Sequence, residues 1–474
     1  MTAQLYAQSF EYIYSTSDDE VISDAVEDAT GNFYLVGTKG ISATGYYSGL
    51  IIKLNSSGDT VNTLIFPPSG DYINLISITK LSDSLFIAFG TKQISSTNDA
   101  QILYIKFDNN LNILQEKTFG HPFYTDQVHK AKINLQNEFM IVGYAIGFPD
   151  LQIFFYRATL DGDSLESFYL GDSFHNEFGW DVLQLPDTSG YLIFSIGWAS
   201  MSPFVHNEIL EINNSGVLDT VVIIEDSHII VSARWISDST FVTASSGYNP
   251  NGPDFSFDLF PHKYDLNFNL LADTLMGPTD TTEIEAPNAI DFIDTNKIFI
   301  GGTINYQSNY WGVDPAYFYL IKFDSNIIPQ WEKVISHNDD YLNLYKVLAT
   351  NDGGILLAGT RYNDLTSGLY ERDIYVIKID SLGNFVTGIN EQPGLQVHEV
   401  IVYPNPVQDA INIKSTINFS ASQFILYDVA GRQVIKKDFN KSASFPVKQI
   451  NAGIYFYQIK SKEGKIEYGK LIKE

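Results

Sequence analysis

Histidines and carboxylates recur at one position of a repeated stretch of this sequence. In three copies a histidine lies 22 residues before the glycine that ends an apolar run, and in a fourth it lies 19 residues before it. These histidines are His121, His175, His337 and His228. Each copy also has a carboxylate near this position, namely Asp19, Asp71, Asp126, Glu177, Asp226, Glu283 and Asp340. In a ring, equivalent positions converge on the central channel, where such groups could bind a cation or a basic ligand.

The same acids also have a structural interpretation. A carboxylate here can accept hydrogen bonds from the turn that enters the following strand, as a device repeated in every copy. The turns NSSGD, DGDS and DSLGN lack the full spacing and the terminal Glu of a calcium loop, so we predict ordinary hairpin turns. No cofactor is predicted, calcium stays an alternative ligand, and metal binding is left open.

Signatures of catalysis are absent from the sequence. It contains no His-Glu-x-x-His, no Gly-x-Ser-x-Gly, no phosphate loop and no dinucleotide fingerprint. The chain has no cysteine, which excludes disulfides, thiolate catalysis and cysteine-ligated metals. No catalytic residue is therefore predicted.

The repeated stretch accounts for most of the chain. Apolar runs such as FYLVGT, FMIVGY and ILLAGT end in a glycine, and the seven glycines are Gly37, Gly90, Gly143, Gly197, Gly247, Gly302 and Gly359. A second strand-like run, a polar turn and a third run follow each of them, and a further short run precedes it. Four short strands in about 54 residues are typical of a propeller blade. We therefore predict a seven-bladed β-propeller over residues 1–389, in an all-β chain with few helices.

The seventh copy lacks its outer strand. The N-terminal run at residues 10–14 has the character of that strand, so we predict that it closes the ring by pairing with the copy at residues 341–388. Closure would remove two unpaired sheet edges. A solenoid or two sandwiches are the alternatives, but a solenoid has no use for a displaced strand.

Aromatic residues gather in the loops that should open on one face of the propeller. They are Tyr46, Tyr47, Trp198, Tyr248, Tyr306, Tyr310, Trp311, Tyr362 and Tyr370. Flat side chains on loops suit sugar rings or protein hot spots. We take Trp198, Tyr248, Tyr310, Trp311 and Tyr362 as ligand-binding candidates, with packing of the loops onto the blades as the alternative.

Charge divides the chain near residue 400. The net charge is −27, made up of −32 over residues 1–400 and +5 over residues 401–474. This shift predicts a domain boundary, with residues 390–400 as a linker. An acidic body repels phosphate backbones, so nucleic acid is not an expected partner. No run of apolar residues is long enough for a transmembrane helix.

Residues 401–474 have motifs of their own. Short alternating strands separated by glycine turns predict a small β-sandwich. The motif residues are Tyr403, Pro404, Asn405, Pro406, Asp428, Gly431, Gly453, Tyr455, Lys470 and Lys473. The four segments that carry them follow one another to the end of the chain.

Together these segments resemble the type A sorting domain of type IX secretion, and the resemblance covers about one-sixth of the chain. The resemblance implies that a leader carries the chain across the inner membrane. The type IX machinery would then recognise the tail and move the protein across the outer membrane, to be secreted or attached to the outer cell surface. It also implies that the tail is commonly cleaved. Ala3 and Ala7 are read as the remnant of a signal-peptide cleavage region, with a short polar N-terminus as the alternative.

Three functions stay open for the propeller. The first is a non-enzymatic protein that binds an extracellular glycan or protein through its aromatic face. The second is a structural or adhesive repeat protein. The third is an exported polysaccharide-active enzyme, which would need two carboxylates, or a carboxylate with His or Tyr, in one pocket.

Overall fold

The chain folds into β-strands. The computed structural model describes residues 9–41, 46–66, 72–94, 99–121, 124–147, 151–171, 175–199, 205–224, 227–248, 257–278, 281–306, 314–362, 371–385, 395–398, 400–415, 421–429, 431–462 and 466–474. Every regular element in these residues is a strand, so the described chain is all-β, as predicted. No helix in these ranges has the length and apolar character needed to span a membrane.

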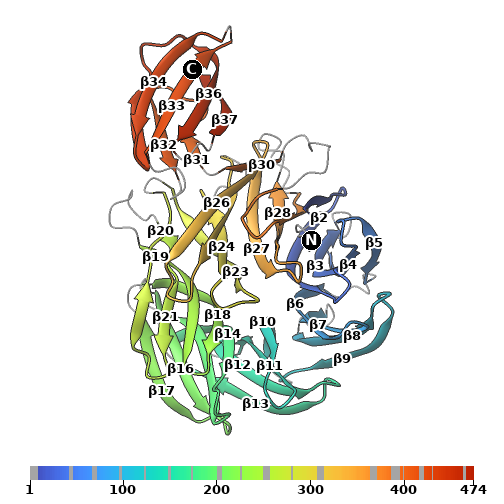
Figure 1. Ribbon diagram of the computed structural model, residues 1–474. Helices are drawn as coiled ribbons and strands as arrows, with labels where there is room; N and C mark the ends of the chain where they lie inside the picture. Colours follow the sequence, from blue (N-terminus) through green and yellow to red (C-terminus); the bar gives the residue numbers. More distant parts are fainter. Residues whose placement is uncertain are drawn as a thin grey trace, which may run out of the picture.

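Antiparallel sheets follow one another along the first 273 residues (Figure 1). The first sheet contains β2 (Asp19–Glu27), β3 (Phe33–Ile41), β4 (Tyr46–Leu54) and β5 (Thr60–Ile65). The second contains β6 (Tyr72–Ser82), β7 (Leu85–Ile94), β8 (Asp99–Asp108) and β9 (Ile113–Phe119). The third contains β10 (Thr125–Ile133), β11 (Glu138–Ile146), β12 (Leu151–Thr159) and β13 (Ser164–Leu170). The fourth contains β14 (His175–Gln184), β15 (Gly190–Ala199), β16 (Val205–Asn213) and β17 (Leu218–Ile224).

Two larger sheets complete the body. A five-stranded sheet contains β18 (Ser227–Ser237), β19 (Thr240–Tyr248), β20 (Phe257–Leu259), β21 (His262–Asp265) and β22 (Leu270–Asp273). A nine-stranded sheet has the order β1 (Phe10–Tyr14), β29 (Asp373–Ile379), β28 (Ile355–Tyr362), β27 (Tyr341–Ala349), β23 (Glu283–Asp291), β24 (Ile298–Ile304), β25 (Tyr317–Phe323), β26 (Pro329–His337) and β30 (Leu395–His398). Its two halves join where β23 and β27 run parallel and pair at Asn288 and Lys346, and where Ala316 and Tyr341 form an isolated parallel bridge.

Both ends of the nine-stranded sheet are strands from distant parts of the sequence. β1 pairs antiparallel with β29, from Phe10 opposite Lys378 to Tyr14 opposite Ile374. β30 pairs with β26, so part of the segment expected as a linker is an added strand.

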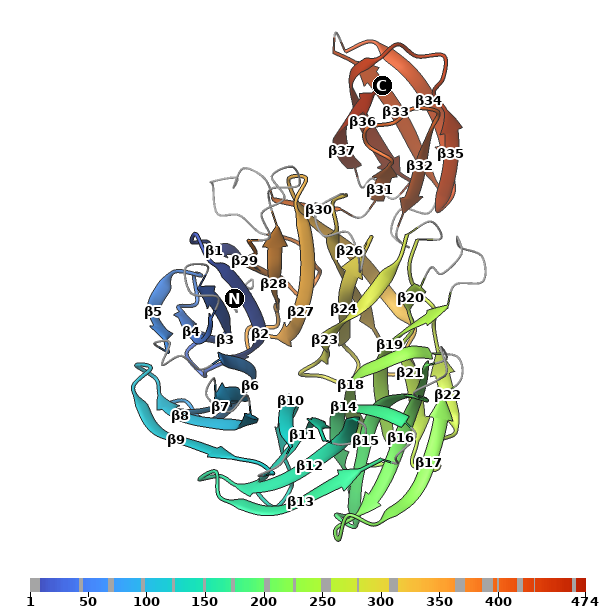
Figure 2. The same ribbon diagram turned by 180° about the vertical axis from the view of Figure 1, so that it is seen from behind.

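The first strands of successive sheets lie around a common centre. β2 contacts β6, β6 contacts β10, and the succession continues through β14, β18, β23 and β27. β27 in turn contacts β2, so the first and last sheets of the body lie side by side (Figures 1 and 2). The structure thus brings the beginning and the end of the body together.

The repeated glycine has a steric cause. On Gly37 a Cβ would lie 2.0 Å from the carbonyl oxygen of Val21, and on Gly143 it would lie 1.9 Å from that of Gln127. Each of these glycines lies opposite a register shift in the first strand of its sheet, where the neighbouring backbone comes unusually close. Only glycine fits such an approach, which explains why the apolar runs end in it.

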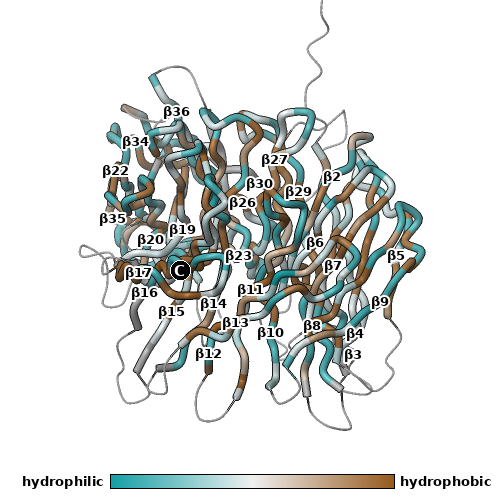
Figure 3. Tube along the Cα trace, turned by 90° about the horizontal axis from the view of Figure 1, so that it is seen from below, coloured by the Kyte–Doolittle hydropathy of each residue, from teal (hydrophilic) through white to brown (hydrophobic). Residues whose placement is uncertain are grey.

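Apolar side chains fill the space between neighbouring sheets. Tyr34 of β3 stacks on Phe86 of β7, with ring centroids 3.9 Å apart, and both are fully buried. Between the next two sheets, Phe89 of β7 packs edge-on against Phe139 of β11. Hydrophobic stretches lie on the strands all around the body (Figure 3). Because burying each large side chain contributes about 1.5–3 kcal/mol, these contacts hold the sheets together face to face.

The tail is a two-sheet sandwich, as predicted. One sheet contains β31 (Val400–Tyr403), β32 (Ala410–Ser415) and β35 (Ser442–Pro446). The other has the order β34 (Gln433–Phe439), β33 (Ser422–Asp428), β36 (Gly453–Ser461) and β37 (Ile466–Lys473). Their inner faces share a core that includes Ile411, Phe424 and Ile459.

Candidate functional site

The repeated carboxylates lie at or next to the beginning of the first strand of each sheet. Asp126, the second residue of β10, is fully buried and accepts the backbone N–H of His121 at 2.9 Å. Asp19, the first residue of β2, accepts the backbone N–H of Arg372 at 3.0 Å and pairs with its guanidinium at 2.5 Å. Glu283 begins β23 and accepts the hydroxyl of Thr281 at 2.6 Å. Asp126 and Glu283 thus bind the segment that enters their own strand, whereas Asp19 binds the residue that precedes β29.

His337 and Asp340 lie together at the entry to β27. The Nδ1 of His337 is 2.6 Å from Oδ2 of Asp340, and its Nε2 is 3.5 Å from Oε1 of Glu11. Arg361 lies 3.6 Å from the same Asp340 oxygen. These largely buried groups pair with one another.

The remaining predicted residues are placed as follows. The ring of His121 stacks on Tyr124 with centroids 4.0 Å apart, and Glu177 lies in β14, partly buried. Asp71, Asp226, Tyr310, Trp311 and Tyr370 lie outside the described residues. His175, Trp198, His228 and Tyr248 belong to strands β14, β15, β18 and β19, but their side chains lie outside the described part.

Tyr362 was expected on an exposed loop but lies at the end of β28. Its side chain is 4% exposed and packs with Tyr341 and Ala316. A ring buried in this way does not face solvent. The prediction of a loop at Tyr362 was wrong because β28 continues for two residues beyond the repeated glycine-threonine pair.

Burial raises the pKa of several of these acids. It raises the pKa of Asp126 to about 6, although the N–H of His121 opposes the shift. It raises the pKa of Glu285, in β23, to about 7, and that of Glu283 well above its ordinary value. These carboxyl groups therefore stay protonated up to a higher pH in the folded protein than in the unfolded chain.

A pH-dependent stability follows for Asp126 and Glu285. Their folded pKa values lie above the ordinary 3.8 and 4.5, so the folded state holds extra protons and loses stability as pH rises through about 4–7. At pH 8 each buried carboxylate should cost about 2–3 kcal/mol. Relative to the original chain, Asp126→Asn with Glu285→Gln should therefore gain stability steadily between pH 4 and 8. Urea unfolding across this range measures the difference, and a difference independent of pH would contradict the assignment.

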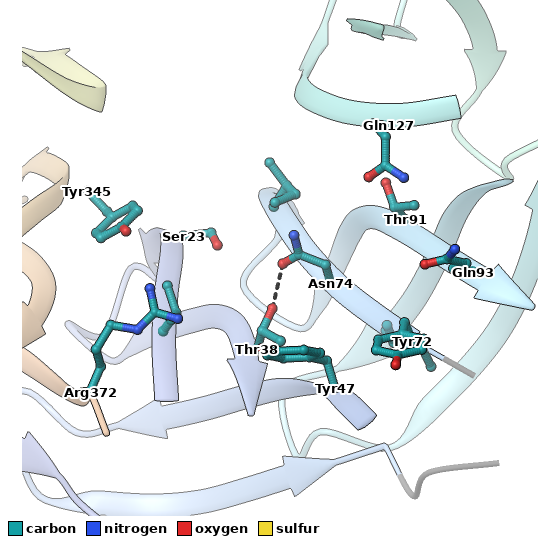
Figure 4. Close-up of a pocket in the computed structure, with 13 residues that line it drawn as sticks. Ser23, Thr38, Tyr47, Tyr72, Asn74, Thr91, Gln93, Gln127, Tyr345 and Arg372 are labelled. Carbon is teal, nitrogen blue, oxygen red and sulfur yellow. Dashed lines mark hydrogen bonds between the residues drawn. The ribbon is translucent and has the colours of Figure 1, made fainter. Parts of the chain in front are cut away.

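A pocket of about 400 Å³ lies where the first strands of neighbouring sheets meet (Figure 4). It is lined by residues of β2, β3, β4, β6, β7, β10 and β27, together with Arg372. The polar lining consists of hydroxyl, amide, phenol and guanidinium groups: Ser23, Thr38, Tyr47, Tyr72, Asn74, Thr91, Gln93, Gln127, Tyr345 and Arg372. None of the lining residues in the described part of the chain is acidic.

Two tyrosines form the outer edge of this pocket. Tyr47 and Tyr72 are 41% and 36% exposed, and their ring centroids are 5.8 Å apart with the rings tilted by 32°. Figure 4 shows the two rings side by side, below Thr38 and Asn74. Tyr47 belonged to the aromatic set seen in the sequence, whereas Tyr72 did not. Tyr72 is the first residue of β6 and so does not belong to the loops that contain the aromatic set.

The charge of Arg372 is already balanced. Its guanidinium contacts both carboxylate oxygens of Asp19, at 2.8 and 2.5 Å. Burial would lower the pKa of Arg372, but the bonds to Asp19 more than offset it and hold the pKa above its ordinary value. The ion pair of Arg372 and Asp19 therefore adds no net charge to the polar pocket.

A bulge in β23 contacts β2 and β10 next to the pocket. Its pairing with β24 shifts register between Glu285 and Ile290. Within this bulge Asn288 donates to the carbonyl of Ser23 at 3.0 Å, and Lys130 of β10 donates to the carbonyl of Pro287 at 3.0 Å. Ser23 also lines the pocket, so the bulge lies next to the pocket. Sequence reasoning missed this feature, although the Pro-Asn pair inside an otherwise regular first strand was its signal.

Three buried aspartates bind the sheets to each other near this centre. Asp181 of β14 accepts the N–H of Ala233 in β18 at 2.8 Å and pairs with Lys132 of β10 at 2.6 Å. The pattern recurs for Asp24, with Lys346 at 2.8 Å, and for Asp291, with Arg234 at 3.1 Å. In each case the cation comes from the preceding sheet around the centre. Because these carboxylates are buried and already paired, we interpret the bonds as structural links between sheets and not as a ligand site.

Metal binding gains no support from the described residues. No group of three or more histidine or carboxylate side chains among them is arranged to hold a metal ion. In the NSSGD turn, Asn55 Oδ1 accepts the backbone N–H groups of Ser57 and Asp59, both at 2.9 Å. In DSLGN, Asp380 accepts those of Leu382 and Asn384. These oxygens thus bind their own turns.

The motif residues of the tail hold its first and last segments together. The amide of Asn405 donates to the carbonyl of Lys470 at 3.0 Å and accepts the N–H of Ile472 at 2.8 Å. Val407 then pairs with Lys473, whose side chain is only 8% exposed. The bonds preceding Pro404 and Pro406 are cis.

Two more motif segments shape the tail. Asp428 accepts the backbone N–H of Arg432 at 2.9 Å and its Nε at 2.7 Å across the turn between β33 and β34. Gly431 adopts a φ of +76° in that turn, a conformation that favours glycine. Gly453 begins β36, and the buried Tyr455 donates to the carbonyl of Asn451 at 2.8 Å.

Comparison with known proteins separates the tail from the body. Residues 401–474 match the family model of a secretion system C-terminal sorting domain, which confirms the resemblance seen in the sequence. No curated protein matches the chain. Among solved structures, the β-propeller domain of the Trilobed protease from Pyrococcus furiosus is 12% identical with a TM-score of 0.45, covering 78% of this chain and 98% of that one. The Neurospora crassa Pan2 WD40 domain is 9% identical with a TM-score of 0.42, covering 75% and 88%.

Proposed function

We propose that this protein, which its type IX sorting domain marks as secreted or attached to the cell surface, is a binding protein for an extracellular glycan. Its body would be a seven-bladed propeller closed by β1. The ligand would enter the pocket edged by Tyr47 and Tyr72. The observation that carries this proposal is the chemistry of the pocket: two exposed aromatic rings beside amides and hydroxyls, with a balanced guanidinium.

The ring proposal rests on contacts and pairing. If the nine-stranded sheet is divided between β23 and β27, the body contains seven sheets whose first strands touch in a closed succession. β1 then supplies the fourth strand of the sheet formed by β27, β28 and β29. This matches the seven glycines of the sequence.

The glycan proposal rests on matched chemistry. Sugar rings present apolar C–H faces that pack on aromatic side chains, and hydroxyls that pair with amides such as Asn74, Gln93 and Gln127. A basic or acidic ligand would need an opposite charge, but Asp19 already neutralises Arg372. A glycosidase would need paired carboxylates in the pocket, and its described lining has none.

Glycan binding can be tested on the full chain. A glycan array identifies the ligand, and calorimetry then compares the original protein with Tyr47→Ala and Tyr72→Ala. Each loss of a stacking ring should weaken binding by about three- to tenfold. Leu114→Ala, an exposed residue of the outer strand β9, should leave affinity unchanged and is the matched control.

Other outcomes would decide against the proposal. If no glycan binds, or if both tyrosine variants bind as tightly as the original chain, the pocket is not a glycan site. Release of products from a bound polysaccharide would favour the enzyme hypothesis.

A further inference from the structure

The sorting domain carries an exposed apolar face whose role its motifs do not explain. Alternate residues of β36 point to opposite sides of the sheet: Tyr455, Tyr457 and Ile459 are buried in the sandwich core. Between them, Ile454 and Phe456 are 47% and 49% exposed. Leaving two large apolar side chains in water on a small domain is unfavourable unless a partner covers them.

Strand register gathers further apolar residues around this pair. Phe456 lies opposite Tyr427 of β33, and Ile454 lies opposite Ile472 of β37. Ile425, two residues before Tyr427, lies on the same side of the sheet but is only 8% exposed, so it adds little to the surface. Directly opposite residues in antiparallel strands have Cβ atoms about 5 Å apart, so Ile454, Phe456, Tyr427 and Ile472 form one continuous patch. We call this patch the outer face.

Lysines border the outer face. Lys470 of β37 lies opposite Phe456, and Lys436 of β34 lies opposite Ile425. Lys460, near the end of β36, lies opposite Gln423. All three lysines are exposed. An apolar centre with a polar rim is the usual anatomy of a protein interface, and here three lysines outnumber one acid, Asp438, which accepts the amide of Gln423 at 2.8 Å.

The contacts of the tail with the body lie elsewhere. Lys414 of β32, in the other sheet of the sandwich, donates to the carbonyl of Gly277 and lies near the buried Glu283. The outer face belongs to the other sheet of the sandwich, which consists of β33, β34, β36 and β37, whereas this contact is made by β32. A second copy is disfavoured as its partner, because two lysine rims would repel each other.

We propose that the outer face is the surface by which the sorting domain docks on a protein of the secretion machinery, in an apolar groove bordered by acidic side chains. The proposal uses the established sorting role of the tail and is independent of the glycan pocket. Phe456 and Ile454 fill the groove as anchors, and Lys436, Lys460 and Lys470 pair with its rim. The motif residues Asn405, Tyr455 and Lys473 have a different task, since they hold the domain together.

Export from the native cell tests this surface. In the full chain, Ile454→Ser with Phe456→Ser should lower the extracellular fraction by about tenfold or more, because two interface anchors are lost. The protein should accumulate in the periplasm instead. Leu218→Ser with Ile223→Ser is the matched control, because these exposed apolar residues lie on the body strand β17; it should be exported normally. A chain without residues 401–474 sets the level of complete failure.

A second variant protects the test against misfolding. Lys470→Glu changes an exposed side chain, so the purified chain should keep its thermal unfolding curve while its export falls several-fold. Normal export of both outer-face variants would overturn the proposal. Loss of export by the serine variant alone, together with a lowered unfolding temperature, would also overturn it. A purified chain that changes from dimer to monomer in the serine variant would assign the face to self-association.

Discussion

Replacing Asp181 by alanine should lower the free energy of unfolding of the body by about 3–5 kcal/mol. The carboxylate is 1% exposed and accepts the backbone N–H groups of Val182 at 2.7 Å and Ala233 at 2.8 Å. It also pairs with Lys132 at 2.6 Å. Alanine would leave two buried backbone donors without their acceptor and Lys132 without its counter-ion, although the lysine still donates to the carbonyl of Ala233 at 3.0 Å.

The lysine makes the cost larger than that of a lost surface pair. Burial lowers the pKa of Lys132 to about 8, while the Asp181 charge opposes this shift. Without the aspartate, that opposing effect disappears and the lysine must lose its charge or be hydrated. Lys132→Met should therefore recover part of the stability lost in Asp181→Ala, and a double-mutant cycle would give a clear coupling energy.

Tryptophan fluorescence during urea unfolding measures this effect cleanly, because all five tryptophans precede residue 401. The signal then reports on the body and not on the tail. Asp161→Ala is the matched control: it breaks an Asp–Lys pair of similar length, with Lys106, on the surface. The control should unfold like the original chain. An equally small effect for Asp181→Ala would show that the bonds of Asp181 do not hold the sheets together.

The sequence predicted the parts of the fold that depend on local pattern. The repeated apolar runs and turns gave an all-β chain, and the glycines at their ends marked a close backbone approach, as Gly37 shows. The tail was identifiable because its motif residues make specific contacts. Asn405, for example, both donates to and accepts from the backbone of the last strand, which its side-chain amide can do because it carries an N–H donor and a carbonyl acceptor.

The candidate site was harder to predict because it depends on which strands become neighbours. Tyr47 and Tyr72 are separated by a sheet boundary, and their rings meet only when β4 lies beside β6. The ion pair of Asp181 and Lys132 likewise joins two different copies of the repeat. Repeated carboxylates such as Asp126 stood out in the sequence, but position alone did not distinguish a bond to the entering backbone from a ligand contact.

Removing β1 should destabilise the whole body, because the proposed ring depends on this strand. β1 forms the edge of its sheet through five paired residues, and Phe10 is 6% exposed against Phe33, with ring centroids 5.7 Å apart. Phe10→Ala alone should cost about 3–5 kcal/mol. A chain without residues 1–15 loses that contact and also leaves the edge of β29 unpaired, which promotes association between chains.

The truncated chain should therefore aggregate at concentrations where the full chain is monomeric, as light scattering would detect. A synthetic peptide of residues 8–16 should restore the monomer by adding the missing strand to β29, since main-chain bonding at a sheet edge can be supplied in trans. Removing only residues 1–8, which precede β1, serves as the control and should leave the unfolding curve unchanged. A monomeric, fully stable chain without residues 1–15 would mean that the first and last sheets hold together without β1, and the contacts of β2 with β27 and β28 would then have to close the ring unaided.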